Sequence, residues 1–153
     1  RNLLTYAYLC QKLYMLSYHF EGVPEFFEPE KYSDWLHAIS DSAGFELGAL
    51  TYIFCSDDYL LRLNQEYLKH DTLTDIITFD YVSGKLISGD VYISLDRVAE
   101  NALAFEVSKE DELLRVMAHG LLHLCGYGDK TLENQELMTL KENEKIKMFH
   151  VEQ

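Results

Sequence analysis

The residues with the clearest capacity for chemistry are two histidines four positions apart and an aspartate six positions beyond the second. His119 and His123 are spaced by one helical turn, so their side chains would share one face of a helix. Gly126 can end that helix in a left-handed turn, which would bring Asp129 back towards the two imidazoles. Two imidazoles and a carboxylate suit zinc and leave a fourth position for water, whose pKa would fall towards about 7. The spacing therefore predicts a catalytic metal site.

The same spacing occurs in the metzincin zinc proteases, which have a glycine and a third ligand at these offsets. Those proteases carry a glutamate directly after the first histidine as general base, and this chain has Gly120 at that position. A peptidase or amidase would therefore need another group to activate water. This makes a metallopeptidase the second interpretation of the same residues.

Three separate motifs resemble those of the YbeY family of bacterial metal-dependent endoribonucleases. They are His119-Gly-x-Leu-His123-Leu-x-Gly126-Tyr127, Asn64-x-x-Tyr67-x-x-x-Asp71-x-x-Thr74-Asp75-Ile-Ile-x-Phe79 and Gly89-Asp90-Val-x-Ile93. The resemblance extends over residues 15–149. It implies a zincin-like fold, one zinc ion per chain, a cytoplasmic location and a role in ribosomal RNA maturation and ribosome assembly.

Two positions depart from the pattern of that family. Asp129 stands where most members have a third histidine, and a carboxylate can bind zinc in its place. Leu68 stands where members usually have an arginine, whose loss would weaken phosphate binding and stabilisation of the transition state. Lys69 or His70 could supply the missing positive charge, so we expect these two residues to act in catalysis.

The other residues near the motifs have milder interpretations. Asp71, Thr74 and Asp75 are expected to line the metal cleft, or to act as capping groups and as partners of the metal ligands. Cys125 follows His123 by two residues and would lie on another face of the helix. We therefore expect Cys125 in the hydrophobic core.

Hydrophobic periodicity predicts the elements that must position this site. Alternating or β-branched runs predict strands near 15–20, 48–55, 74–82 and 89–95, the last two forming a hairpin. Helical spacing predicts helices near 29–42, after Ser56, and near 96–105, 108–126 and 131–149. Because strands and helices mix without strict alternation, the expected fold is α+β, with a mixed four-stranded sheet packed by about four to five helices.

We interpret residues 1–14 as an extension, with an anchoring helix as the alternative, and residues 15–153 as one domain.

Length, composition and charge limit the possible classes. The chain has 153 residues, 48% of them hydrophobic and 25% charged, and no apolar run approaches the ~20 residues of a membrane span. Its 13 basic and 26 acidic residues give a net charge of −13, which repels phosphate backbones. We therefore expect ribosomal RNA to be presented by the pre-ribosome, with ribosomal proteins or assembly factors as partners.

The cysteines point to a reducing compartment. Cys10, Cys55 and Cys125 are odd in number and far apart, which is not a disulfide framework. Buried reduced thiols in a cytosolic protein are the expectation.

The leading hypothesis is a zinc-dependent endoribonuclease of single-strand type that acts in ribosomal RNA maturation and ribosome assembly. The metallopeptidase or amidase remains one alternative. Another is a zinc-stabilised assembly factor without turnover, which would bind ribosomal proteins through its acidic surface and which Leu68 favours.

Overall fold

A computed structural model describes residues 15–25, 28–69 and 72–151. The strands in these ranges are β1 (Leu16–Phe20), β2 (Glu46–Cys55), β3 (Ile76–Asp80) and β4 (Leu86–Ser94). The helices are α2 (Pro29–Ser42), α3 (Asp57–Leu63), α4 (Leu95–Phe105), α5 (Lys109–Leu124) and α6 (Leu132–Val151), and a π-helical turn, η1 (Asn64–Leu68), follows α3. The predicted α+β class, with four strands and about four to five helices, is confirmed for this part of the chain. The extension predicted for residues 1–14 lies outside the described residues.

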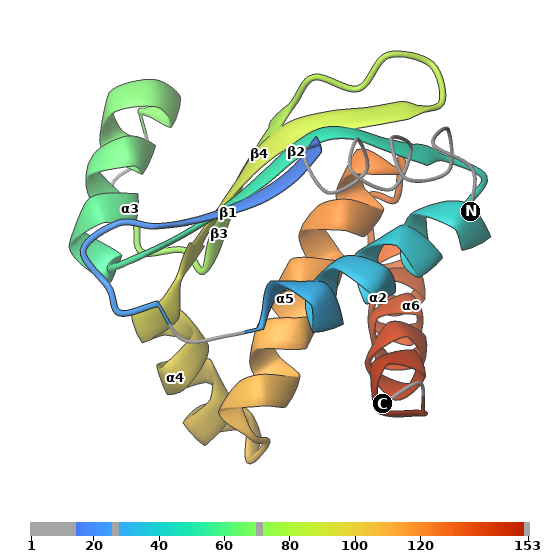
Figure 1. The fold of residues 1–153 in the computed structure, drawn as a ribbon. Helices are drawn as coiled ribbons and strands as arrows, with labels where there is room; N and C mark the ends of the chain where they lie inside the picture. Colours follow the sequence, from blue (N-terminus) through green and yellow to red (C-terminus); the bar gives the residue numbers. More distant parts are fainter. Residues whose placement is uncertain (1–14, 26–27, 70–71, 152–153) are drawn as a thin grey trace.

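The strands form one mixed sheet in the order β1-β2-β4-β3 (Figure 1). β1 and β4 run parallel to β2, and β3 pairs antiparallel with β4, which confirms the predicted hairpin. β4 begins at Leu86, earlier than predicted, because Leu86 and Ile87 pair with Glu46 and Leu47 of β2. Local sequence does not reveal such a distant partner.

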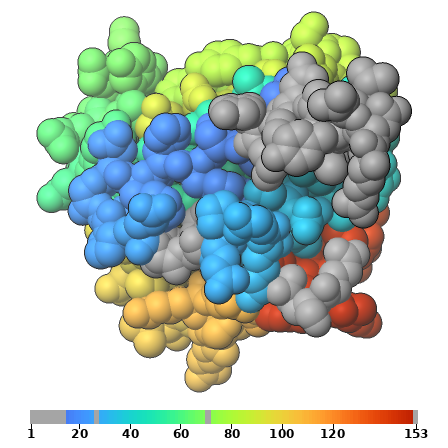
Figure 2. Space-filling model, viewed as in Figure 1, coloured from blue at the N-terminus to red at the C-terminus, as the bar shows by residue number. Residues whose placement is uncertain are grey.

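The core lies between one face of this sheet and the helices. Buried side chains of β2 and β4, such as Tyr52 and Val91, pack against α5, which contributes Leu114, Met117 and Leu121. Helices α4 and α6 both contact α5, and α2 crosses it on the side facing the viewer in Figure 1. Figure 2 shows that α2 and the α4–α5 region form part of the molecular surface on this side. None of the helices in the described ranges combines the length and apolarity that crossing a membrane requires.

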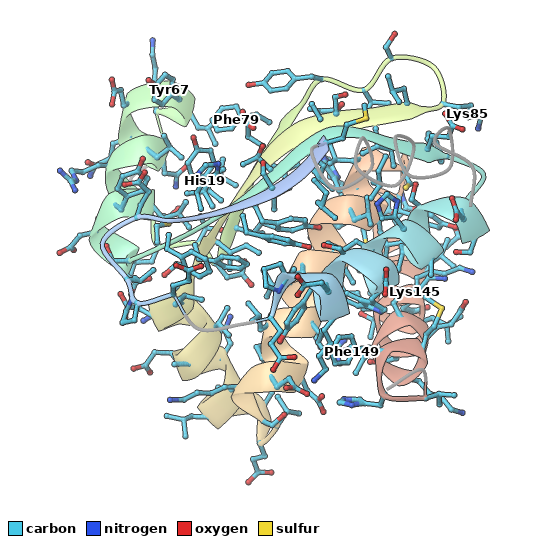
Figure 3. The ribbon with its side chains drawn as sticks, in the orientation of Figure 1. His19, Tyr67, Phe79, Lys85, Lys145 and Phe149 are labelled. Atoms are coloured by element: carbon cyan, nitrogen blue, oxygen red, sulfur yellow. The ribbon has the colours of Figure 1, made fainter. Side chains whose placement is uncertain are left out.

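A smaller cluster covers part of the opposite face of the sheet. Leu60 of α3 packs with Cys55 and Ile77. The exposed ring of Tyr67 meets Phe79 edge-on with 6.2 Å between ring centroids, and Figure 3 shows the two side chains near one another. This cluster holds α3 and η1 on the face that α5 does not occupy.

Gly120 determines how closely α5 can approach the sheet. A Cβ atom at Gly120 would lie 2.9 Å from Cγ1 of Val91 and 3.0 Å from Cδ1 of Ile76. Both distances are shorter than ordinary packing allows, so a larger residue would displace the helix that carries both histidines. The absence of a glutamate after His119 therefore has a structural reason, because that position faces the sheet.

Substituting Gly120→Ala is expected to lower the free energy of unfolding by roughly 1 kcal/mol. Overpacking typically costs about 1–3 kcal/mol and outweighs the gain in helix propensity of about 1 kcal/mol. Urea unfolding measures this difference. Gly128→Ala is the control, because a Cβ there meets nothing closer than 3.4 Å, and its change should stay within about 0.5 kcal/mol. A Gly120→Ala protein as stable as the native chain would contradict the packing argument.

Candidate metal centre

Helix α5 is held at its start by its own sequence. The hydroxyl of Ser108 accepts a hydrogen bond from the backbone N–H of Asp111 at 3.0 Å, and acidic residues fill the first turn, where the helix dipole favours negative charge. The helix is buried along most of its length. His119 is on a side that remains partly open, with 25% of its side chain exposed.

The two ring nitrogens of His119 have different partners. Nδ1 lies 2.7 Å from Oε2 of Glu142 in α6, and Nε2 lies 3.4 Å from Oδ2 of Asp129. The hydrogen bond with Glu142, strengthened by the charges of Glu142 and Asp129, raises the pKa of His119 above its ordinary value. With Nδ1–H donating to Glu142, Nε2 is the nitrogen that faces Asp129 and the cavity beside it.

Asp129 reaches His119 because the chain reverses at the end of α5. Gly126 has φ +100°, a conformation that L side chains rarely adopt. Its N–H donates to the carbonyl of His123 at 3.0 Å, and the N–H of Tyr127 donates to the carbonyl of Leu122 at 3.0 Å. This turn satisfies the final carbonyls of the helix and returns the loop to the open side of α5.

His123 takes no part in this pair. Its side chain is exposed, one turn further along α5, and has no hydrogen bond or ion pair within the described ranges. No group of three or more histidine, cysteine, aspartate or glutamate residues in those ranges is arranged to hold a metal ion. The structure thus brings together two of the three predicted ligands, and the place of His123 among them remains a prediction.

A partly buried ion-pair network of α5 and α6 supports His119 on its Nδ1 side. Glu142 is only 6% exposed, and its Oε1 accepts a hydrogen bond from Nη1 of Arg115 at 3.2 Å. Nη2 of Arg115 donates to Oδ1 of Asn143 at 2.7 Å, which fixes the guanidinium. Carboxylates that orient a metal-binding imidazole in this way are common around metal ions. Neither Glu142 nor Arg115 is among the site residues predicted from the sequence.

A cavity of about 380 Å³ opens beside His119 and Asp129. It lies between α4, α5, α6 and the start of β3. Its walls include Asp75, Ile76, Asn101, Phe105, Glu112, Arg115, Val116, Gln135, Met138, Thr139 and Glu142. Burial raises the pKa of Asp75, while the neighbouring His119 opposes that rise. The cavity therefore combines the candidate ligands with an acidic wall.

The other predicted site residues lie elsewhere. The hydroxyl of Thr74 donates to the carbonyl of Ile76 at 3.2 Å, a local contact at the start of β3. Lys69 follows η1 as its C-cap, with φ +55°, and is not among the described residues that line the cavity. His70 and Asp71 fall outside the part of the chain that the structure describes.

Cys125 is half-buried and packs against the main core. Burial raises the pKa of its thiol to about 11. Cys125 is therefore a protonated thiol at neutral pH, as expected for a cysteine of the hydrophobic core.

Glu112 is the most unusual group in the cavity wall. It is 2% exposed, its Oε1 has no hydrogen-bond partner within the described ranges, and the nearest cation, Nε of Arg115, is 3.7 Å away. Burial raises its pKa to about 7, with Asp75 and Glu142 adding to the rise and Arg115 opposing it. Glu112 therefore holds its proton more tightly in the folded chain than in the unfolded chain.

Because the pKa of Glu112 is higher in the folded chain than in the unfolded chain, its ionisation should lower the free energy of unfolding as the pH rises. The loss begins near the ordinary pKa of about 4.5 and is complete above the folded value of about 7. Glu112→Gln removes the titration, so its stabilising effect relative to the native chain should be about 1–3 kcal/mol larger at pH 8 than at pH 5. Urea unfolding at both pH values measures the change. An equal effect at both pH values would show that Glu112 does not titrate in this range.

The fold and the site together define an α+β protein with a histidine–carboxylate site beside an acidic cavity. The chain belongs to the endoribonuclease YbeY family, whose model matches residues 23–150. A relative from Flavobacterium johnsoniae, described as endoribonuclease YbeY, is 52% identical over 139 residues, which cover 91% of this chain and all of the relative. The relative of the same description from Bacteroides thetaiotaomicron is 45% identical over 135 residues, 87% of this chain and 98% of that one.

A solved structure supports the same fold. The solution structure of a Thermotoga maritima protein superposes with a TM-score of 0.66 at 27% sequence identity. The match covers 90% of this chain and 91% of that one. The architecture in Figure 1 is thus shared over nearly the full length of both chains.

Proposed function

We propose that this chain is a zinc-dependent endoribonuclease that cleaves single-stranded regions of ribosomal RNA during ribosome maturation in the cytoplasm. The observation that carries the proposal is His119, which Glu142 holds from behind and which faces Asp129 at the edge of a cavity. Membership of a family described as endoribonucleases supports the choice of substrate.

The donor set fits a zinc ion. Because Nδ1 of His119 is engaged by Glu142, Nε2 is the nitrogen available for a metal, and Asp129 offers an oxygen 3.4 Å from it. His119, His123 and Asp129 would hold one ion, an interpretation consistent with a zincin-like fold in which α5 carries both histidines. A zinc ion with three protein ligands would supply Lewis acidity and a bound water of lowered pKa.

The residues around this centre have separate tasks. Glu142 and Arg115 keep the ring of His119 in one orientation, which preserves its position during turnover. Lys69 and His70 would bind a phosphate of the RNA, in place of the arginine usual in the family. The net charge of −13 gives little affinity for free RNA, so the pre-ribosome or its proteins would present the substrate.

Cleavage assays on the zinc-loaded chain test this function. We expect a single-stranded RNA oligomer to be cut, a chelator to stop the reaction and added zinc to restore it, while an unstructured peptide stays intact. His119→Ala should be inactive. The matched control is His19→Ala, because His19 is an exposed histidine of β1 on the sheet face away from α5 (Figure 3).

Each other outcome contradicts a different part of the proposal. Cleavage of the peptide but not the RNA would identify a metallopeptidase. RNA cleavage that persists in chelator would exclude metal dependence. No turnover on RNA, whether free or in pre-ribosomal particles, would leave a zinc-stabilised assembly factor as the function.

A further inference from the structure

The cavity beside His119 has a second wall that the proposed chemistry does not use. Phe105, the last residue of α4, lines it with 63% of its surface exposed. Asn101 of α4, together with Gln135 and Thr139 of α6, also lines it. The side chains of these three polar residues make no hydrogen bond within the described part of the chain, so their donors and acceptors are available to a ligand.

The charges of the cavity exclude a phosphate from its interior. Carboxylates of Asp75, Asp129 and Glu142 face it, and the guanidinium of Arg115, the one arginine among the described lining residues, is already engaged by Glu142 and Asn143. A phosphate inside would meet net negative charge. A neutral planar group with N–H donors suits these walls, since carboxylate and amide oxygens accept hydrogen bonds.

A nucleobase has these properties. Single-stranded RNA is commonly recognised by unstacked bases that pack on aromatic side chains and hydrogen-bond through their edges. The volume of about 380 Å³ falls in the range of small-molecule sites, about 300–1,000 Å³. The exposed ring of Phe105 offers the stacking surface, and the amides of Asn101 and Gln135 offer the paired donors and acceptors that suit a purine edge.

We propose that this cavity binds the unpaired purine base of a nucleotide adjacent to the cleaved phosphate, stacked on Phe105 and hydrogen-bonded by Asn101 and Gln135. The inference rests on the proposed endoribonuclease function and adds to it a determinant of substrate choice. It explains how an acidic cavity can serve RNA, because the base enters the cavity and the phosphate stays at the edge, near His119 and Asp129.

The test uses single-stranded RNA oligomers with one cleavage site and an abasic nucleotide placed in turn on each side of it. For the native chain, kcat/KM should fall roughly 5- to 150-fold at one of these positions, the range expected when one stacked base is lost. Phe105→Ala should cause a similar fall with the intact oligomer. The abasic nucleotide should then cause no further loss, because both changes remove the same contact.

Two further variants make the test specific. Phe105→Trp should keep the activity and its dependence on the base, since an indole ring also stacks. Leu103→Ala is the control, because Leu103 is 77% exposed on the same helix and is not among the described residues that line the cavity. It should behave like the native chain.

The possible failures are distinguishable. The base site is overturned, and the proposed function stands, if the native chain cleaves RNA but the abasic nucleotide does not lower kcat/KM. The same conclusion follows if the abasic nucleotide lowers kcat/KM of Phe105→Ala as much as that of the native chain. An oligomer with uracil in place of the purine that is cleaved with the same kcat/KM as the purine oligomer would likewise exclude a purine site. If the native chain cleaves the intact RNA neither as free oligomers nor within pre-ribosomal particles, the proposed function fails first and the base site fails with it.

Discussion

Replacing His119 with alanine is expected to remove both zinc binding and RNA cleavage. His119 is the candidate ligand that contacts a buried supporting carboxylate and a second candidate ligand at once, through its two ring nitrogens. Loss of an outer partner of a metal ligand typically costs about 10–100-fold, so loss of the ligand itself should lower kcat/KM by roughly 10³-fold or more. Metal analysis after dialysis should find zinc in the native chain and little in the variant.

The control for this prediction is His19→Ala, which also removes one imidazole. The side chain of His19 is exposed on β1, on the face of the sheet opposite α5. This variant should retain native zinc content and cleavage. A His119→Ala protein that still binds one zinc ion per chain would show that the metal lies elsewhere.

The second large effect is expected for Glu142→Gln. The substitution keeps the shape of the side chain but removes the charge that supports the Nδ1–H of His119 and pairs with Arg115. The ring of His119 then loses its fixed orientation, and Arg115 loses its main ion pair. We expect zinc affinity to fall about 10–100-fold. Competition with a chromophoric chelator measures this affinity without reference to activity.

Glu144→Gln provides the comparison on the same helix. Glu144 is more than half exposed and pairs with Lys141 and Lys145, away from the histidines. Its loss should leave zinc affinity unchanged. Equal losses in the two variants, or an unchanged affinity in Glu142→Gln, would contradict a positioning role for Glu142.

The ligand pair illustrates what sequence can predict about such a site. The start of α5 follows from Ser108, and its end follows from Gly126, so the direction of the chain after the helix could be inferred. That inference placed Asp129 near the histidines, and in the structure it lies beside His119. Local signals sufficed because all of these residues are within one helix and one turn.

The supporting network could not be inferred in this way. Helix α6 has many glutamates and lysines and little amphipathic pattern, yet Glu142 and Lys145 are buried. Hydrophobic periodicity assigns charged residues to the surface, so it gives no signal for a glutamate buried against a histidine 23 residues away. The burial of Glu112 could not be predicted for a similar reason. An acidic residue in the first turn of a helix is ordinarily exposed to solvent, where it interacts with the helix dipole.

The cavity likewise depends on tertiary structure. Asn101 and Phe105 lie in the second half of α4, and Gln135 and Thr139 lie in the first half of α6. The packing of α4 and α6 around α5 brings these four residues to one cavity. An exposed phenylalanine near a helix end has no distinctive sequence pattern. The role proposed for Phe105 follows only from its position in the wall of the cavity that His119 also lines.

The most direct test of the central claim is anomalous X-ray diffraction from crystals of the chain loaded with zinc. We expect one zinc peak within about 2.0–2.2 Å of Nε2 of His119, an imidazole nitrogen of His123 and a carboxylate oxygen of Asp129. A position for solvent should remain on the ion. A zinc ion bound away from His119, or coordinated without Asp129, would contradict the account.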